Sequence, residues 1–283
     1  MGQPIAVVAE SVCCLPPSLC AELGILLVPM WILRGGRGYR DGIDVTAQEV
    51  FAWLEEGPPY PTASAPSPAD YLAAFEEAAQ RGAQRVLALT VARWLSAAHQ
   101  HARRAAARAP IPVEVVDTGT AAAAQGLVVR EAALRIRAGA PLEEVMGWAA
   151  QAGMRARLVA LVRSLEHLAR SGRIPRLVHL VNRRLGTVPL LAIGKGRVRR
   201  AGVAAGYEAA VGKLVSEVQR ARRRASRLWV AVTEAGMREE AERLVRTLQG
   251  LGVADPPDLL PFTPVMALNT GPQVLGVAYL PEP

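Results

Sequence analysis

The stretch Ile5-Ala6-Val7-Val8-Ala9-Glu10-Ser11 places an apolar run directly before a carboxylate and a hydroxyl. Short apolar runs of this kind are typical of strands that are buried on both faces of a sheet. Glu10 and Ser11 would then close the first strand at the carboxyl edge of the sheet, where ligands bind in many α/β proteins. The alternative is that these two polar residues form a solvated turn.

Further apolar runs in the first half of the chain alternate with helical patterns. The runs cover residues 28–33, 86–91 and 113–116, and helices are predicted over 71–81, 95–108 and 120–138. Ser67 and Pro68 supply an N-cap followed by proline at the start of the first of these helices. Strands that alternate with helices predict a mainly parallel sheet flanked by helices, and we assign it to an N-terminal α/β domain over residues 1–157.

The pattern changes in the second half of the chain. The runs 188–193 and 197–203 flank Gly194-Lys195-Gly196, which is typical of a hairpin turn. Helices are predicted over 208–224 and 237–251, and strands over 228–233, 259–262 and 273–280. Hairpins combined with a pair of helices predict a separate C-terminal α+β domain with a largely antiparallel sheet over residues 158–283.

Composition limits the classes of function. The 283 residues are 51% apolar and 20% charged, and no apolar run reaches the length of about 20 residues that a membrane-spanning helix needs. The net charge of +8 is spread over several helices and aromatic content is only 5%, so nucleic-acid binding is not expected. The N-terminus lacks a basic leader, and the odd number of cysteines (Cys13, Cys14 and Cys20) indicates reduced thiols. We therefore expect a cytoplasmic protein without stable membrane insertion.

Catalytic and cofactor motifs are not recognisable. His99 and His101 are two residues apart on a predicted helix, where they would point to different faces and could not share a metal ion. The glycine-rich segment 34–38 could cradle a phosphate, but a turn follows it instead of a helix, which favours a hairpin connection. Asp117 has no histidine at an informative spacing. The sequence therefore predicts neither an enzyme nor a bound cofactor or metal.

Several segments, taken together and in order, resemble the DegV family. Val7-Val8-Ala9-Glu10-Ser11 resembles the family's V-T-D-S-T, and Asn269-Thr270-Gly271-Pro272 resembles its H-T-G-P. The segments between them are similar to Y-x-D-G-x-D, P-x-T-S-Q-P-S, L-S-G-T-Y-Q and L-E-Y-L-K-K-G-G-R-I, and they begin at Tyr39, Pro61, Leu95 and Leu165. The matches span almost the whole chain.

This resemblance implies a two-domain, non-catalytic carrier that holds a long-chain fatty acid or another lipid between its domains. Members of the family present the carboxyl group of the fatty acid to a separate fatty-acid kinase, which is therefore an expected partner. The alternative is a degenerate member that acts as an interaction or structural protein and binds no lipid.

The departures from the family motifs concern polar residues. Glu10 replaces an aspartate, Ala63 a threonine and Asn269 a histidine, while Ala92 and Arg93 replace paired serines. The ligand-binding candidates implied by the resemblance are Glu10, Ser11, Thr62, Ala63, Ser64, Ala92, Arg93, Ser96, Arg173, Asn269 and Thr270. Thr62 and Ser64 could equally stabilise the turn before a helix, and Arg93 and Arg173 could be surface charges. The lost polar groups predict weak discrimination between a fatty acid and its ester unless an arginine compensates.

Overall fold

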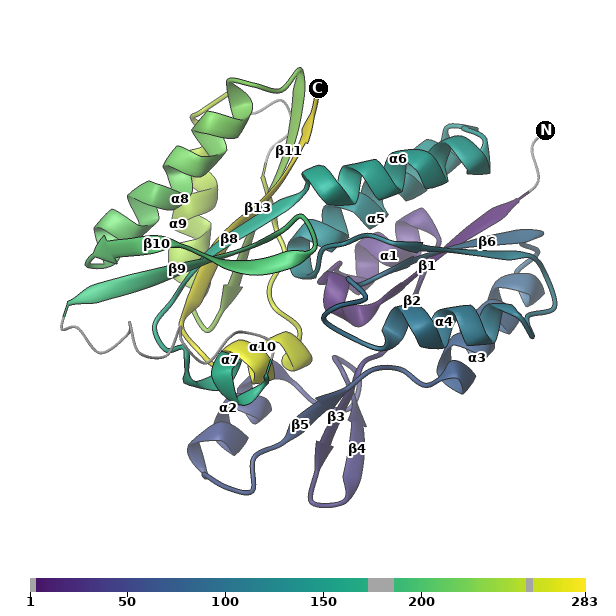
Figure 1. Ribbon diagram of the computed structural model, residues 1–283, viewed down its shortest axis with the longest axis horizontal. Helices are drawn as coiled ribbons and strands as arrows, with labels where there is room; N and C mark the ends of the chain where they lie inside the picture. The colour runs from purple at the N-terminus through teal and green to yellow at the C-terminus, as the bar shows by residue number, and fades with distance from the viewer. Residues whose placement is uncertain (1–3, 173–185, 253–256) are drawn as a thin grey trace.

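The N-terminal half is built on a parallel sheet. In the computed structural model, which describes residues 4–172, 186–252 and 257–283, the strand order is β2-β1-β6-β7. These strands are β1 (Ile5–Glu10), β2 (Ile25–Val28), β6 (Arg85–Thr90) and β7 (Val113–Asp117), and all of their pairings are parallel. The helices are α1 (Pro17–Leu23), α5 (Ala122–Arg137) and α6 (Leu142–Arg155) on one face, and α3 (Pro68–Gln80) and α4 (Ala98–Ala106) on the other (Figure 1). The predicted α/β architecture is confirmed.

A small antiparallel sheet, which the sequence did not predict, follows β2. The expected single strand over 28–33 is wrong, because β2 ends at Val28 and β3 (Trp31–Arg34) belongs to a separate sheet of order β4-β3-β5. Pro29 lies at the break, where its missing N–H cannot continue a hydrogen-bonded ladder. The other two strands are β4 (Arg37–Arg40) and β5 (Thr62–Ser64).

The glycine-rich segment forms the turn of a hairpin. Arg34 pairs with Arg37 across the antiparallel β3–β4 ladder, and Gly35 and Gly36 both have positive φ, 57° and 77°. Two successive positive φ values are what a tight two-residue hairpin turn requires. The hairpin prediction is confirmed, and the phosphate-cradle alternative is wrong because a strand follows the glycines.

The second half contains a six-stranded mixed sheet with the order β10-β9-β8-β13-β11-β12. Its strands are β8 (Arg157–Val162), β9 (Thr187–Gly194), β10 (Arg197–Ala205), β11 (Arg227–Ala235), β12 (Asp258–Leu259) and β13 (Val274–Glu282). Every pairing is antiparallel except β11–β12, so the predicted largely antiparallel sheet is confirmed. The division of the chain at residues 157 and 158 stays a prediction; β8, the first strand of this sheet in chain order, begins at Arg157.

The strand expected over 259–262 is shorter in the structure than predicted. β12 covers only Asp258 and Leu259, but the N–H groups of Leu260 and Phe262 still donate to carbonyl oxygens of β11, at 2.8 Å each. The short helix α10 (Pro264–Thr270) follows. Thr263 precedes Pro264 at the start of α10, which is the same pattern of hydroxyl residue and proline that begins α3 at Ser67. The remaining short helices are η1 (Ser11–Cys13), α2 (Ala47–Glu55) and α7 (Glu166–Arg170).

The six-stranded sheet is covered on both faces. The helices α8 (Tyr207–Arg222) and α9 (Arg238–Gln249) pack on one face and form a separate apolar core with it. The other face belongs to the larger core, which it shares with the parallel sheet and with α5 and α6 of the N-terminal half. Figure 1 shows the two sheets side by side, with α7 and α10 below the junction.

Glu10 anchors the end of the first strand inside the protein. Its side chain is fully buried, accepts hydrogen bonds from the Tyr71 hydroxyl and from Gln125 Nε2 (2.9 Å), and also accepts one from the backbone N–H of Val91 (2.9 Å). The solvated turn considered for Glu10 and Ser11 is therefore wrong. Burial raises the pKa of the Glu10 carboxyl above its ordinary value, and the three hydrogen bonds oppose this rise only in part.

This burial predicts a pH-dependent stability. The folded protein holds the Glu10 proton more tightly than the unfolded chain does. The side chain therefore contributes most to the free energy of unfolding below its ordinary pKa, and this contribution falls as the pH rises through the raised pKa of the folded state. The variant Glu10→Gln has no titratable group at this position. Between about pH 4.5 and about pH 8, the free energy of unfolding of the wild type, measured by urea unfolding, should therefore fall relative to that of Glu10→Gln. If the free energy of unfolding of the wild type instead rose with pH relative to that of Glu10→Gln, Glu10 would be stabilised as a carboxylate.

Candidate functional site

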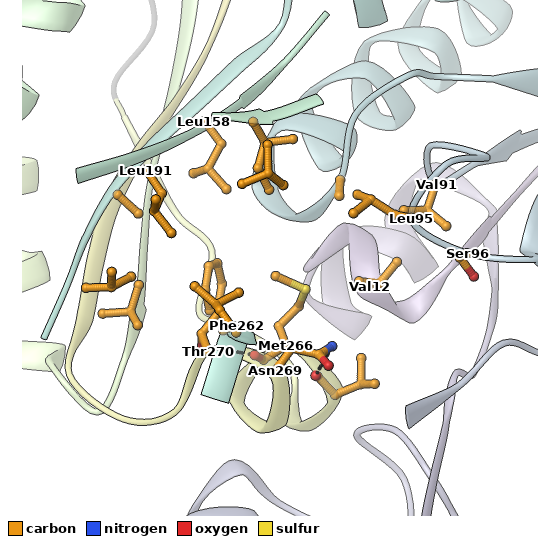
Figure 2. A pocket seen from close by; sticks show the side chains of 18 of the residues that line it. Val12, Val91, Leu95, Ser96, Leu158, Leu191, Phe262, Met266, Asn269 and Thr270 are labelled. Atoms are coloured by element: carbon orange, nitrogen blue, oxygen red, sulfur yellow. Dashed lines mark hydrogen bonds between the residues drawn. The ribbon is translucent and has the colours of Figure 1, made fainter. Parts of the chain in front are cut away.

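An apolar cavity lies between the two large sheets. Its empty volume, which includes the open solvent at its mouth, is about 840 Å³. Side chains from both halves of the chain line it (Figure 2): Val12, Met30, Val91, Leu95, Ser96, Ala121, Leu158, Ala160, Val162, Leu168, Leu191, Ile193, Val198, Phe262, Val265, Met266, Asn269, Thr270 and Val274. The lining is thus almost wholly hydrocarbon.

The polar members of this lining already have protein partners. Thr270 Oγ1 lies 3.0 Å from the carbonyl oxygen of Met266, and Asn269 Nδ2 donates to the carbonyl of Val265 at 2.8 Å, so both side chains bond within α10. Ser96 Oγ accepts the N–H of Ala98 at 3.2 Å. The cavity therefore offers a polar ligand group few hydrogen-bond donors and suits a mainly apolar ligand.

A buried carboxylate ties α10 to the N-terminal half. Asp41, which is 2% exposed, accepts a hydrogen bond from Ser11 Oγ at 2.6 Å and another from the N–H of Val265 at 2.8 Å. Ser11 Oγ in turn accepts the N–H of Met30 at 3.0 Å. Met30, Val265 and Val12, the neighbour of Ser11, all line the cavity. The Asp41–Ser11 pair therefore holds three parts of the cavity wall in register.

Asp41 was missed as a functional residue, although it lies in the segment similar to Y-x-D-G-x-D. Burial raises the pKa of its carboxyl, while the bonds from Ser11 and Val265 act in the opposite direction. Its partner at position 265 is 224 residues away in the chain. No spacing rule within one sequence could have indicated that contact.

The predicted ligand-binding residues do not form one site in the structure but lie in several places. Ser96, Asn269 and Thr270 line the apolar cavity. Thr62 and Ala63 line a second pocket, and Asn269 lines this pocket as well as the apolar cavity. Glu10, Ser11 and Ala92 are buried, and the first two are engaged in the hydrogen bonds described above.

The remaining predicted residues lie away from the apolar cavity or outside the described chain. Ser64 Oγ lies 3.3 Å from the carbonyl oxygen of Ala65. Arg93 has a side chain that is 76% exposed and lies 3.5 Å from Asp117 in an ion pair, so it is placed as a surface charge. Arg173 lies outside the described residues.

The histidines of α4 have separate partners. His99 Nδ1 lies 3.0 Å from Thr90 Oγ1, and His101 Nδ1 lies 2.7 Å from the carbonyl oxygen of Pro66. Across residues 4–172, 186–252 and 257–283, no group of three or more His, Cys, Asp or Glu side chains could hold a metal ion. Within the same ranges, the helices are too short or too polar to cross a bilayer.

The chain is similar to known proteins along nearly its whole length. Residues 4–282 match the model of a family described as "Uncharacterised protein, DegV family". A DegV domain-containing protein of Deinococcus radiodurans is 32% identical over 98% of both chains. A fatty-acid-binding DegV family protein of Thermus thermophilus has a solved structure that is 30% identical and covers 99% of this chain and 100% of its own, with a TM-score of 0.88. The fatty-acid-binding DegV of Bacillus subtilis, at 20% identity, shares the fold with a TM-score of 0.86 over 99% and 100% of the chains.

The Asp41 contacts predict how α10 responds to mutation. Asp41→Ala would leave the N–H of Val265 and the hydroxyl of Ser11 without their buried partner, which typically costs about 2 to 4 kcal/mol of unfolding free energy. Hydrogen exchange at the Val265 amide should accelerate more than exchange in α8.

The matched control is Asp44→Ala, which removes a carboxylate from the same turn. The hydrogen bonds of Asp44 run to Arg40 at the surface, whereas Asp41 bonds to Val265 of α10, so protection at Val265 should be unchanged. Equal acceleration in both variants would contradict a specific role for Asp41.

Proposed function

Because this chain belongs to the DegV family, we propose that it is a non-catalytic carrier that binds one long-chain fatty acid between its two large sheets. The apolar cavity carries the proposal. Burying an alkyl chain gains about 0.8 kcal/mol per methylene, so a chain of about 16 carbons supplies roughly 10 kcal/mol before the cost of association. Affinity of this kind requires apolar surface and no catalytic group.

The related structures support the proposal. The Thermus thermophilus protein is described as fatty-acid-binding, and its fold matches this chain over nearly its whole length. The cavity of this chain lies where the parallel sheet and the six-stranded sheet meet, so both halves contribute to its wall. A ligand held there would be enclosed by residues that are far apart in the sequence.

The buried thiols are poor candidates for covalent chemistry. Burial raises the pKa of the Cys14 thiol to about 12 and that of Cys20 to about 11, and it also raises the pKa of Cys13. A thiolate nucleophile at neutral pH requires a lowered pKa.

Free cysteines also suit a reducing compartment, so we place the proposed carrier in the cytoplasm.

The proposal extends to a protein partner. A carrier that presents its ligand must leave the carboxyl end accessible while the alkyl chain stays buried. A fatty-acid kinase is the partner that the family resemblance implies.

Native mass spectrometry of the purified protein tests the proposed ligand. We expect a bound mass that corresponds to a fatty acid, retained under native conditions and released on denaturation. A protein that is empty and also fails to bind added hexadecanoic acid would favour the alternative of an interaction protein without lipid.

Narrowing the cavity should remove the ligand. Val198 lines the cavity from the edge strand β10, so Val198→Trp would place an indole in the space of the alkyl chain. We expect lipid content to fall at least about tenfold, with a loss of stability within the range of about 1 to 3 kcal/mol that is typical of overpacking. Mass spectrometry and urea unfolding measure the two effects.

The matched control is Arg199→Trp. It adds the same side chain one residue further along β10, at an exposed position where successive residues face opposite sides of the sheet. Lipid content should stay at the wild-type level. If Val198→Trp also retained its lipid, the ligand would have to lie elsewhere.

A further inference from the structure

A polar pocket adjoins the apolar cavity. Its empty volume is about 720 Å³, and Asn269 lines both spaces. The other residues that line it are Leu54, Tyr60, Pro61, Thr62, Ala63, His167, Arg170, Ser171 and Leu268. On α7, His167 faces this pocket while its neighbour Leu168 lines the apolar cavity. The two spaces therefore meet along α7 and α10.

Two basic side chains one turn apart on α7 line the polar pocket. The Arg170 guanidinium lies 3.5 Å from the centre of the Tyr60 ring, pairs with Glu166 at 2.6 Å, and has Nη1 3.5 Å from His167 Nδ1. A guanidinium can only donate, so Nδ1 of the imidazole is the acceptor and Nε2 carries the proton. The geometry thus gives His167 one N–H donor.

The His167 ring is held in place by the chain segment after α10. A Cβ atom at Gly271 would lie only 2.2 Å from Cδ2 and 2.7 Å from Nε2 of the ring, so the edge of the ring that carries the Nε2 proton lies beside Gly271, in a space that only glycine leaves open. Burial, followed by the charge of Arg170, lowers the pKa of His167, so the imidazole is neutral near pH 7. A neutral imidazole with a fixed orientation can donate one directed hydrogen bond.

A fatty acid needs donors of this kind. The hydrogen-bonding groups of Asn269 and Thr270 described above are used within α10, so the apolar cavity can hold the alkyl chain but supplies few donors to a carboxylate. Arg170 has five N–H donors, and its ion pair with Glu166, whose side chain is 60% exposed, is a surface pair that costs little to exchange.

We propose that the polar pocket binds the carboxylate of the lipid, with His167 Nε2–H and the Arg170 guanidinium as its donors. This inference rests on the proposed function and names the head-group site for it. The alkyl chain would run from the pocket past Asn269 into the apolar cavity. Donors from α7 would thereby replace the polar group that is lost at Ala63, which lines the same pocket.

The test compares hexadecanoic acid with its methyl ester, which has the same alkyl chain without the charge. Affinities would be measured on delipidated protein by displacement of cis-parinaric acid. Hydrogen bonds to a charged group are worth about tenfold or more in affinity each, so we expect the wild type to prefer the acid by at least about 30-fold. His167→Phe and Arg170→Met should each reduce that preference by at least about tenfold and leave the affinity for the ester within about threefold.

Two further variants separate recognition from structure. His167→Gln keeps an N–H donor and should restore part of the preference. Arg163→Met removes an exposed arginine from the segment before α7 that lines neither pocket, and it should leave the preference unchanged.

The outcomes distinguish the two levels of the proposal. Tight binding of both ligands with a preference that survives His167→Phe and Arg170→Met would overturn the head-group site and leave the carrier function intact. A loss of affinity for acid and ester alike in these variants would also overturn it. Failure of the wild type to bind either ligand would overturn the carrier function itself.

Discussion

The six-stranded sheet is apolar on both faces, and this constraint determines how the molecule is assembled. The helices α8 and α9 cover one face and form a core of their own with it. The opposite face must be covered by the N-terminal half, which contributes α5, α6 and the end of the parallel sheet to the common core. The apolar cavity is the part of this junction that side chains do not fill. An apolar surface left in that position favours an apolar ligand, because the ligand completes the burial of the sheet.

Two buried carboxyl groups hold the segments around the cavity together, and the one on Asp41 joins the two halves of the chain. Glu10 joins β1 to α3, α5 and the end of β6 through Tyr71, Gln125 and Val91. Asp41 joins the hairpin β3–β4 to η1 and α10 through Ser11 and Val265. Each carboxylate replaces its lost hydration with several donors, which is the condition under which such a group is tolerated in a core. The apolar wall thus depends on polar contacts that lie just behind it.

The sequence predicted the fold class well because local patterns determine it. Apolar runs at residues 5–9 and 86–91, with a helix capped at Ser67 between them, indicated a parallel sheet. The Gly194-Lys195-Gly196 turn indicated the β9–β10 hairpin. The small sheet was missed because Pro29 interrupts what looks like one apolar run. The site was harder to predict, since Asp41 meets Val265 and His167 meets Gly271 only in the folded chain.

The central claim is that the cavity between the sheets holds an alkyl chain. A crystal structure of the protein with 16-bromohexadecanoic acid tests it most directly, because the anomalous signal of bromine locates the terminal carbon. We expect the bromine to lie among the side chains of Leu158, Leu191 and Ile193, with the carboxylate at the opposite end beside α7. Bromine located outside the cavity, or a cavity closed by its own side chains in a protein saturated with the ligand, would contradict the account.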